Sequence, residues 1–248
     1  ENGILLVNAT QGVEVGTEIF ARHAVKHQKP LIIAVNQLDH EKADWQATID
    51  SLKQAFGNKV VLVQYPVNPG ASFDTFIDVL KMKMYKFKDE NGTRESFEIP
   101  EDQKEIAQIL HQQLVEMAAE NDENLMETFF DKGVLSEDEI RAGMKEGMVN
   151  GDILPVFCLS AKKDIGVKRI MEFTINAGIT PDKSDNLLKD GNEVKVDSNG
   201  PTSIFVYKTA QEQHLGDVSY FKVMSGKLTE GMDLVNPETG AKERIAQI

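Results

Sequence analysis

Cysteine and tryptophan are almost absent from this sequence of 248 residues, which contains one of each. The single cysteine, Cys158, cannot form a disulfide within the chain, which excludes a disulfide-stapled secreted scaffold. No apolar run approaches the roughly 18 residues of a membrane-spanning helix. The first residues, Glu1 to Gly3, carry no basic region of the kind that opens an export signal. We therefore expect a cytoplasmic protein with no membrane partner.

Basic residues are also scarce, with 27 Lys and Arg against 40 Asp and Glu and a net charge of −13. This balance argues against general nucleic-acid binding by this chain alone, because phosphates require a basic face. Residues 89–150, called the acidic segment below, hold 17 acidic and 5 basic residues, a net of −12. Such a surface either solvates helix faces or attracts a basic protein partner. Both interpretations stay open at this stage.

Several common catalytic patterns are missing as well. The chain contains no Gly-x-Ser-x-Gly, Cys-x-x-Cys or Gly-x-Gly-x-x-Gly sequence, which removes most hydrolase, zinc-ribbon and dinucleotide-binding interpretations. His23 and His27 have a spacing that suits a metal on a helix, but no carboxylate motif joins them. We therefore expect no metal site and no catalytic residue within this chain.

The hydrophobic pattern predicts an α/β fold. Fully apolar strands are expected at residues 3–8, 31–35, 60–63 and 153–159, and the first three alternate with helical patterns. In the first helix Val13, Ile19, Phe20, Ala24 and Val25 fall on one side; the second is expected to begin after Asp44 and end at Gly57. Alternating helices and buried strands favour a mostly parallel, doubly wound sheet with ligands at the strand ends.

A different pattern interrupts this alternation. Residues 81–87 and 94–99 read as an antiparallel hairpin turning at Asn91-Gly92, and three helical stretches follow Pro100. Ser136 and Glu139 have the spacing of a capping box. We divide the chain into a parallel-sheet part at 1–65 and 153–180, an inserted α+β subdomain at 66–152, and a polar linker at 181–200. Residues 201–248 are strand-rich and form the last part.

Two polar sequences follow predicted strands. Asn36-Gln37-Leu38-Asp39 comes after the strand at 31–35, and Ser160-Ala161-Lys162 comes after the strand at 153–159. A carboxylate offers two adjacent acceptors that match the ring N–H and the exocyclic amine of guanine, and adenine lacks that donor pair. Small residues such as Ser160 and Ala161 let backbone N–H groups approach a base carbonyl oxygen. Together the two sequences predict a guanine-binding site at the strand ends.

At these residues the chain resembles the translational GTPases, and those of the elongation factor G type most closely. Asn36 to Asp39 is similar to the family's Asn-Lys-x-Asp motif, with Gln37 in place of lysine, and Ser160 to Lys162 is similar to its Ser-Ala-x motif. Residues 76–83 resemble its inserted strand, and residues 216–228 resemble its β-barrel signature. The resemblance implies that residues 201–248 begin a β-barrel, which needs more strands than they supply. Asn8 stands where the family usually has aspartate.

The resemblance implies a P-loop-NTPase-like sheet and binding of GTP or GDP through Asn36, Gln37, Asp39, Ser160, Ala161 and Lys162. The phosphate loop, the switches and the residues for Mg²⁺ are implied to lie upstream, so this chain alone is not expected to hydrolyse GTP. The implied partners are the ribosome, its stalk protein through the acidic segment, and ribosomal RNA for the longer protein, which is expected to be a monomer. A release or ribosome-protection factor, or a non-hydrolytic interaction module, stays open as an alternative to translocation.

Overall fold

A four-stranded parallel sheet organises the first part of the chain. The computed structural model describes residues 1–89, 91–183, 194–214 and 216–248. The strands lie in the order β1-β2-β8-β3, and their bounds are β1 Gly3–Asn8, β2 Leu31–Asn36, β8 Leu154–Cys158 and β3 Val60–Leu62. All four strands were expected from their apolar runs. Their parallel pairing places the carboxyl ends of β2 and β8 side by side, with Val35 opposite Cys158.

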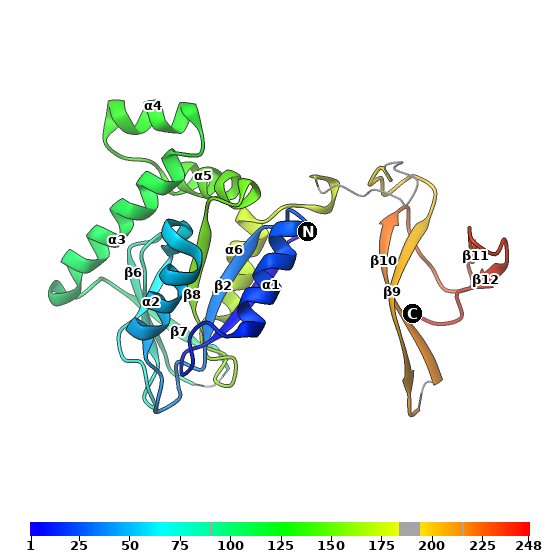
Figure 1. The fold of residues 1–248 in the computed structure, drawn as a ribbon, viewed down its shortest axis with the longest axis horizontal. Helices are drawn as coiled ribbons and strands as arrows, with labels where there is room; N and C mark the ends of the chain where they lie inside the picture. The colour runs from blue at the N-terminus through cyan, green and yellow to red at the C-terminus, as the bar shows by residue number, and fades with distance from the viewer. Residues whose placement is uncertain (90, 184–193, 215) are drawn as a thin grey trace. The chain divides into compact units, whose positions relative to one another are not determined.

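Helices cover both faces of this sheet (Figure 1). Helix α1 Val15–Lys26 and helix α2 Trp45–Phe56 pack on the face that carries Leu5, Ile33 and Val156. Helix α6 Val167–Ala177 packs through Ile170 and Phe173 on the opposite face. The predicted bounds of α2 are confirmed: the Asp44 carboxylate accepts a hydrogen bond from Ala47 N at 2.9 Å, and Gly57 ends the helix with a positive φ of 70°.

A second, antiparallel sheet follows β3. Its strands lie in sequence order, with bounds β4 Gln64–Pro66, β5 Thr75–Asp78, β6 Lys83–Phe87 and β7 Arg94–Phe97. The hairpin of β6 and β7 was predicted, and β5 overlaps residues 76–83, which the resemblance identified as a strand. Strand β4 was not predicted, because three residues are too short to show a period. Residue 90, in the predicted turn at Asn91-Gly92, lies outside the described residues. Tyr65, Ile77 and Val79 form the core of this sheet.

Three helices complete the insertion, as predicted: α3 Glu101–Ala119, α4 Glu123–Lys132 and α5 Glu137–Asn150. The capping box is present, since Glu139 N donates to Ser136 Oγ and Ser136 N donates to the Glu139 carboxylate. Helices α3 and α5 add Leu114, Ala118 and Met144 to the core beneath α6. Helix α4 contributes no buried residue and lies at the outer end of the insertion (Figure 1).

An ion pair with no solvent exposure fastens the antiparallel sheet to α6. Arg169 Nε donates to Asp78 Oδ2 at 2.6 Å, and the two side chains are 1% and 0% exposed. Burial alone would lower the pKa of Arg169, but the Asp78 carboxylate outweighs it, so the net pKa lies above the ordinary value. Gln64 Nε2 and Lys81 N also donate to Asp78. The insertion is therefore tied to the parallel sheet by a fully hydrogen-bonded charge pair.

Some predicted apolar faces are exposed. Helix α1 forms where its pattern predicts, yet Phe20 is 69% exposed and Val25 is also exposed, because only Thr17 and Ala21 of this helix are buried. On β1, Ile4 and Leu6 point away from the cores, and the outer edge of this strand has no neighbour among the described residues. These four side chains keep half or more of their surface exposed.

The chain divides into two compact units, Glu1–Ile179 and Thr180–Ile248. The second unit contains two antiparallel strand pairs: β9 Ser203–Glu212 with β10 Gly216–Ser225, and β11 Asp233–Val235 with β12 Lys242–Arg244. It also contains a short 3₁₀ turn at Pro181–Lys183. A similar 3₁₀ turn in the first unit, Gly57–Lys59, precedes β3. Residues 184–193, in the expected linker 181–200, lie outside the described residues. Within the described ranges, no helix has both the length and the apolar character needed to cross a bilayer.

Candidate functional site

Two loops that follow neighbouring parallel strands form the candidate site. Asn36 is the last residue of β2, and Asp39 lies three residues further along the chain. Ser160 follows the end of β8 by two residues, and Ala161 and Lys162 come next. Because β2 and β8 are adjacent and parallel, both loops emerge at the same sheet edge, where open α/β sheets bind ligands.

Three hydrogen bonds join the two loops. Ala161 N donates to Asn36 Oδ1 at 3.0 Å, and the Ser160 hydroxyl donates to Asp39 Oδ1 at 2.7 Å. Leu38 N donates to Leu159 O at 3.3 Å. Residues 121 to 125 positions apart in the sequence are thereby held in one arrangement, so the structure brings together the two polar sequences that the strand pattern singled out.

Asn36 and Asp39 each have one polar group that is available to a ligand. Within the described residues, neither Asn36 Nδ2 nor Asp39 Oδ2 has a hydrogen-bond partner, and both side chains are half-buried. A carboxylate has about four lone-pair sites, so Asp39 can accept two ligand N–H groups besides the Ser160 hydroxyl. This donor and acceptor set fits the edge of guanine, which presents a ring N–H and an amine together with acceptors.

Ser160 has a role that the sequence did not reveal. Its N–H donates to Ile165 O at 3.0 Å within its own loop, and its fully buried hydroxyl holds Asp39 while it accepts from Lys163 N. Ser160 therefore orients the carboxylate through its side chain. The pattern of a small residue after a strand cannot distinguish a hydroxyl contact from a backbone contact.

Gln37, Ala161 and Lys162 are the exposed members of the predicted set, and two of them, Gln37 and Lys162, have long side chains. Gln37 adopts a left-handed conformation with φ of 63°, which turns the chain sharply between Asn36 and the fully buried Leu38. Lys162 is the third residue of the 160–165 loop, after Ser160 and Ala161. Both side chains are free to lie over a ligand held by Asn36 and Asp39.

The insertion makes hydrogen bonds to both loops of the site, and no pattern in the sequence predicted these contacts. Gly70 N donates to Leu38 O at 2.7 Å, and Lys163 Nζ donates to Ala71 O at 3.0 Å. The loop between β4 and β5 thus contacts both ligand-facing loops. These contacts connect residues that lie 32 and 92 positions apart, so no local period or motif could have identified them.

Gln64 supports β8 immediately before the site. Its Oε1 accepts from Cys158 N at 3.1 Å, while its amide donates to Asp78 Oδ2 at 3.2 Å. Cys158 is fully buried, and burial first, then the charge of Asp78, raises the pKa of its thiol well above the ordinary value. The thiol therefore stays protonated and unreactive, in agreement with its interpretation as a small core residue.

Asn8 is the last residue of β1, the strand that pairs with β2 on the side away from β8. Its Oδ1 accepts from Thr10 N at 2.9 Å and from the Thr10 hydroxyl at 3.0 Å, which stabilises the turn that follows β1. An aspartate could accept the same two hydrogen bonds. The asparagine at this position therefore preserves the local turn.

Comparison with known proteins identifies the family. The model of the elongation factor Tu GTP-binding domain matches residues 1–178. The chain belongs to the translational GTPase family. A relative from Thermotoga maritima, described as an elongation factor G-like protein, is 32% identical over 253 aligned residues, which cover 100% of this chain and 36% of the relative.

A solved structure of a protein from Thermus thermophilus has the same fold as this translational GTPase. It superposes with a TM-score of 0.79 at 25% identity, covering 97% of this chain and 34% of that protein. The chain thus spans about a third of the length of the relatives that it matches. The predicted fold class, a parallel α/β sheet with additional antiparallel sheets, is confirmed.

Membership of this family implies guanine-nucleotide binding. The sequence contains no Gly-x-x-x-x-Gly-Lys-Ser/Thr loop for the phosphates. Within the described ranges, no three His, Cys, Asp or Glu residues gather to hold a metal ion. The free groups of Asn36 and Asp39 match the hydrogen-bonding pattern of the guanine edge.

Proposed function

We propose that this chain is the base-recognising half of the GTP-binding domain in an elongation-factor-G-like GTPase that acts on the ribosome in translocation. The supporting observation is the pair of loops in which Ser160 and Ala161 hold Asp39 and Asn36 at the ends of adjacent strands. Asp39 accepts the ring N–H and amine of guanine, and Asn36 donates to the ring edge. Gln37 and Lys162 cover the two faces of the base. Phosphate binding and hydrolysis then require a phosphate loop outside this chain.

Base selection can be tested by exchanging its chemistry. In Asp39→Asn the second acceptor becomes an amide donor, which mismatches the guanine amine and matches the 2-carbonyl of xanthine. In a longer protein that carries this chain together with a phosphate loop, the variant should lose affinity for GDP and gain affinity for xanthosine diphosphate. Asp50→Asn, an exposed change on α2 where Asp50 only accepts from Gln46, is the matched control. Unchanged preference for GDP in the Asp39 variant would contradict the proposal.

Turnover is the second test. We expect the longer protein to hydrolyse GTP and not ATP, with strong stimulation by ribosomes, and the chain of 248 residues alone to show no turnover. Hydrolysis by the chain alone would contradict the proposal that phosphate binding and hydrolysis require residues outside this chain. Translocation itself is tested by the movement of messenger RNA on ribosomes supplied with the longer protein and GTP.

A second candidate function is a non-hydrolytic interaction module that works through the acidic segment. The net charge of −12 on residues 89–150 favours it, because such a surface accelerates encounter with a basic partner. The ribosomal stalk protein is the partner that the family suggests. Ribosome binding without stimulated turnover would favour this candidate. A release or ribosome-protection factor of the same GTPase family is a separate alternative, which stimulated turnover without translocation would favour. Binding that does not weaken with salt would count against electrostatic docking.

A further inference from the structure

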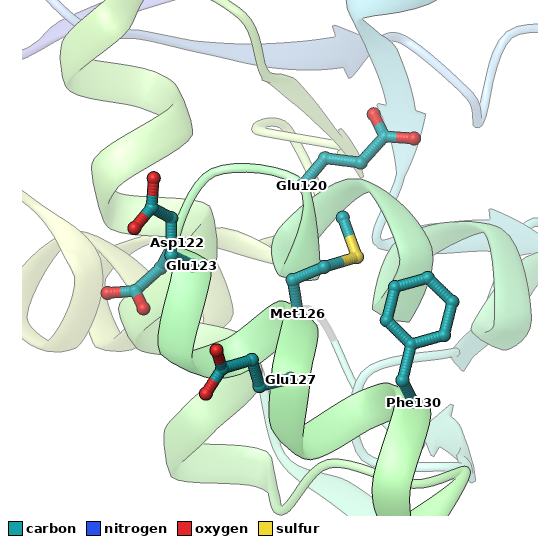
Figure 2. Close-up of a pocket in the computed structure, with 6 residues that line it drawn as sticks. All are labelled: Glu120, Asp122, Glu123, Met126, Glu127 and Phe130. Atoms are coloured by element: carbon teal, nitrogen blue, oxygen red, sulfur yellow. The ribbon is translucent and has the colours of Figure 1, made fainter.

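The insertion reaches the candidate site through a turn and not through its outer helix. The two loops of the site, residues 36–39 and 160–165, are called the base loops below. The groove at α4 that Figure 2 shows is lined by Glu120, Asp122, Glu123, Met126, Glu127 and Phe130. Within the described residues, none of these six is hydrogen-bonded to a base loop. The contacts come instead from residues 68–74, which lie between β4 and β5 and are called the bracing turn below.

The bracing turn is held in one conformation by its own contacts. The Asn68 amide donates to Ser72 O at 2.8 Å and to Asp74 Oδ1 at 3.0 Å. Phe73 is fully buried in the core of the parallel sheet, so it fixes the far side of the turn. A segment that is ordered in this way can orient the groups that it contacts, because it has little freedom left to lose.

Two adjacent residues of the bracing turn contact the two base loops separately. Gly70 N donates to Leu38 O at 2.7 Å, and Ala71 O accepts from Lys163 Nζ at 3.0 Å. Gly70 has a φ of 114°, which residues with a side chain rarely adopt, although a Cβ there would meet no atom within 4 Å. The backbone conformation that aims this N–H therefore requires glycine, and lack of space does not.

Lys163 links the bracing turn to the carboxylate of the candidate site. Its N–H donates to Ser160 Oγ at 3.3 Å, and Ser160 donates to Asp39 Oδ1 at 2.7 Å. Lys163 is half-buried, whereas Lys162 and Lys168 are exposed. No ion pair among the described residues includes Lys163, so a backbone carbonyl and not a carboxylate holds its ammonium. One residue thus connects the insertion with the serine that orients Asp39.

The hairpin of β6 and β7 packs on the same base loop one residue further along. A Cβ on Gly92 would lie 2.6 Å from Asp164 Oδ2 and 3.1 Å from Asp164 O, so glycine is needed for this approach. Asp164 has a left-handed φ of 52°. Two parts of the insertion therefore confine two consecutive residues of the 160–165 loop.

We propose that Lys163 and Gly70 are positioning residues for base recognition, through which the insertion fixes the relative position of the base loops and sets how strongly the site selects guanine. The inference rests on the proposed function above. Asp39 gains a hydrogen bond from the guanine amine only while its free oxygen is aimed at that amine, since a carboxylate that turns away exchanges the contact for water. Lys163 acts through Ser160, and Gly70 acts through Leu38.

Inosine diphosphate provides the measurement, because its base lacks the guanine amine and keeps the ring N–H. In a longer protein that carries this chain with a phosphate loop, GDP should bind at least about tenfold more tightly than inosine diphosphate in equilibrium titration. Lys163→Met should reduce that ratio at least about threefold, because the amine contact suffers most when Asp39 is misaligned. A general loss of folding would weaken both nucleotides equally and leave the ratio unchanged.

Two further lysine variants complete this measurement. Lys163→Arg, whose guanidinium can also donate to Ala71 O, should restore the ratio to within about twofold of the original. Lys168→Met, an exposed change at the start of α6, should leave the ratio unchanged.

The chain of 248 residues gives a second readout that needs no nucleotide. Amide hydrogen exchange at the base loops should accelerate several-fold in Gly70→Ala, because alanine strains the bracing turn. Gly57→Ala is the matched control, since Gly57 also has a positive φ and open space but ends α2. Phe130→Ala, in the groove of Figure 2, controls for an exposed change in the insertion. Neither control should alter exchange at the base loops.

Three results would overturn the proposal. The first is an unchanged ratio of GDP to inosine diphosphate affinity in Lys163→Met, and the second is failure of Lys163→Arg to restore a reduced ratio. The third is equal acceleration of exchange in the Gly70 and Gly57 variants. Equal binding of the two nucleotides by the unmodified longer protein would instead contradict the proposed base recognition, so the two failures are distinguishable.

Discussion

Replacing Arg169 by methionine should destabilise the first unit by about 3 to 4 kcal/mol. The substitution keeps much of the side-chain volume but leaves the Asp78 carboxylate 0% exposed and without a counter-charge. Breaking a buried ion pair from one side costs roughly 3 to 5 kcal/mol. Gln64 and Lys81 still donate to Asp78, which favours the lower half of that range. Because a domain has only about 5 to 15 kcal/mol of stability, the loss should be large.

Urea unfolding followed by tryptophan fluorescence measures this loss of stability in the first unit, which contains the ion pair. Trp45 is the only tryptophan, and it lies at the start of α2 against the core of the first unit. Lys104→Met is the control, because it breaks the exposed pair with Glu101 and should cost less than about 1 kcal/mol.

The double variant Asp78→Asn with Arg169→Met sharpens the test. It should cost at least about 2 kcal/mol less than the two single changes combined, because each single change leaves a charge that the other removes. Strict additivity, or a loss below about 1 kcal/mol in Arg169→Met, would refute the role assigned to this pair.

Three further results are expected. In the longer protein, Gln37→Lys should tighten GDP binding by about 1 kcal/mol, since a charge-assisted contact replaces a neutral one; weaker binding of GDP in equilibrium titration would contradict this. Cys158 should resist thiol reagents in the native chain and react only at the rate of unfolding, because burial raises its pKa; rapid labelling in native buffer would be inconsistent with its packing. Burial, and then the charge of Asp102, raises the pKa of Tyr65 from 10.0 to about 12, so its contribution to stability is complete below pH 10 and falls as the pH rises toward 12. Absorbance titration should show a phenol that ionises near pH 12, and Tyr65→Phe should remove that step from the titration curve.

The elements that the sequence predicted well are those marked by an apolar run or by capping residues. The apolar runs of β2 and β8 end in polar residues, and α2 begins and ends at a cap that the sequence displays. Those two strand ends were sufficient to predict a site that combines Asn36 with Ser160. The parallel pairing of β2 with β8 then follows from the general preference of alternating helices and strands.

Long-range contacts had no such signal. Gly70 and Leu38 meet through backbone groups, and Asp78 meets Arg169 across 91 residues, so composition and period carry no trace of either contact. Exposure was also misjudged where an apolar stripe has nothing to cover it. Phe20 and Val25 follow the same helical period as the buried Ala21 side of α1, and only the tertiary arrangement distinguishes them.

The contacts between the insertion and the base loops limit how this fold can be trimmed. Removing residues 64–152 would leave a smaller parallel-sheet domain, although β3 and β8 are parallel, with Val60 opposite Leu154, and would still need a crossover connection between them. Such a deletion would remove Gln64, Gly70 and Asp78 together. It would strand the Cys158 N–H, the Leu38 carbonyl and the Arg169 guanidinium in the interior without partners. A minimal version of this domain would therefore require new residues at all three points, so the insertion behaves as part of the nucleotide domain's framework and not as a removable accessory.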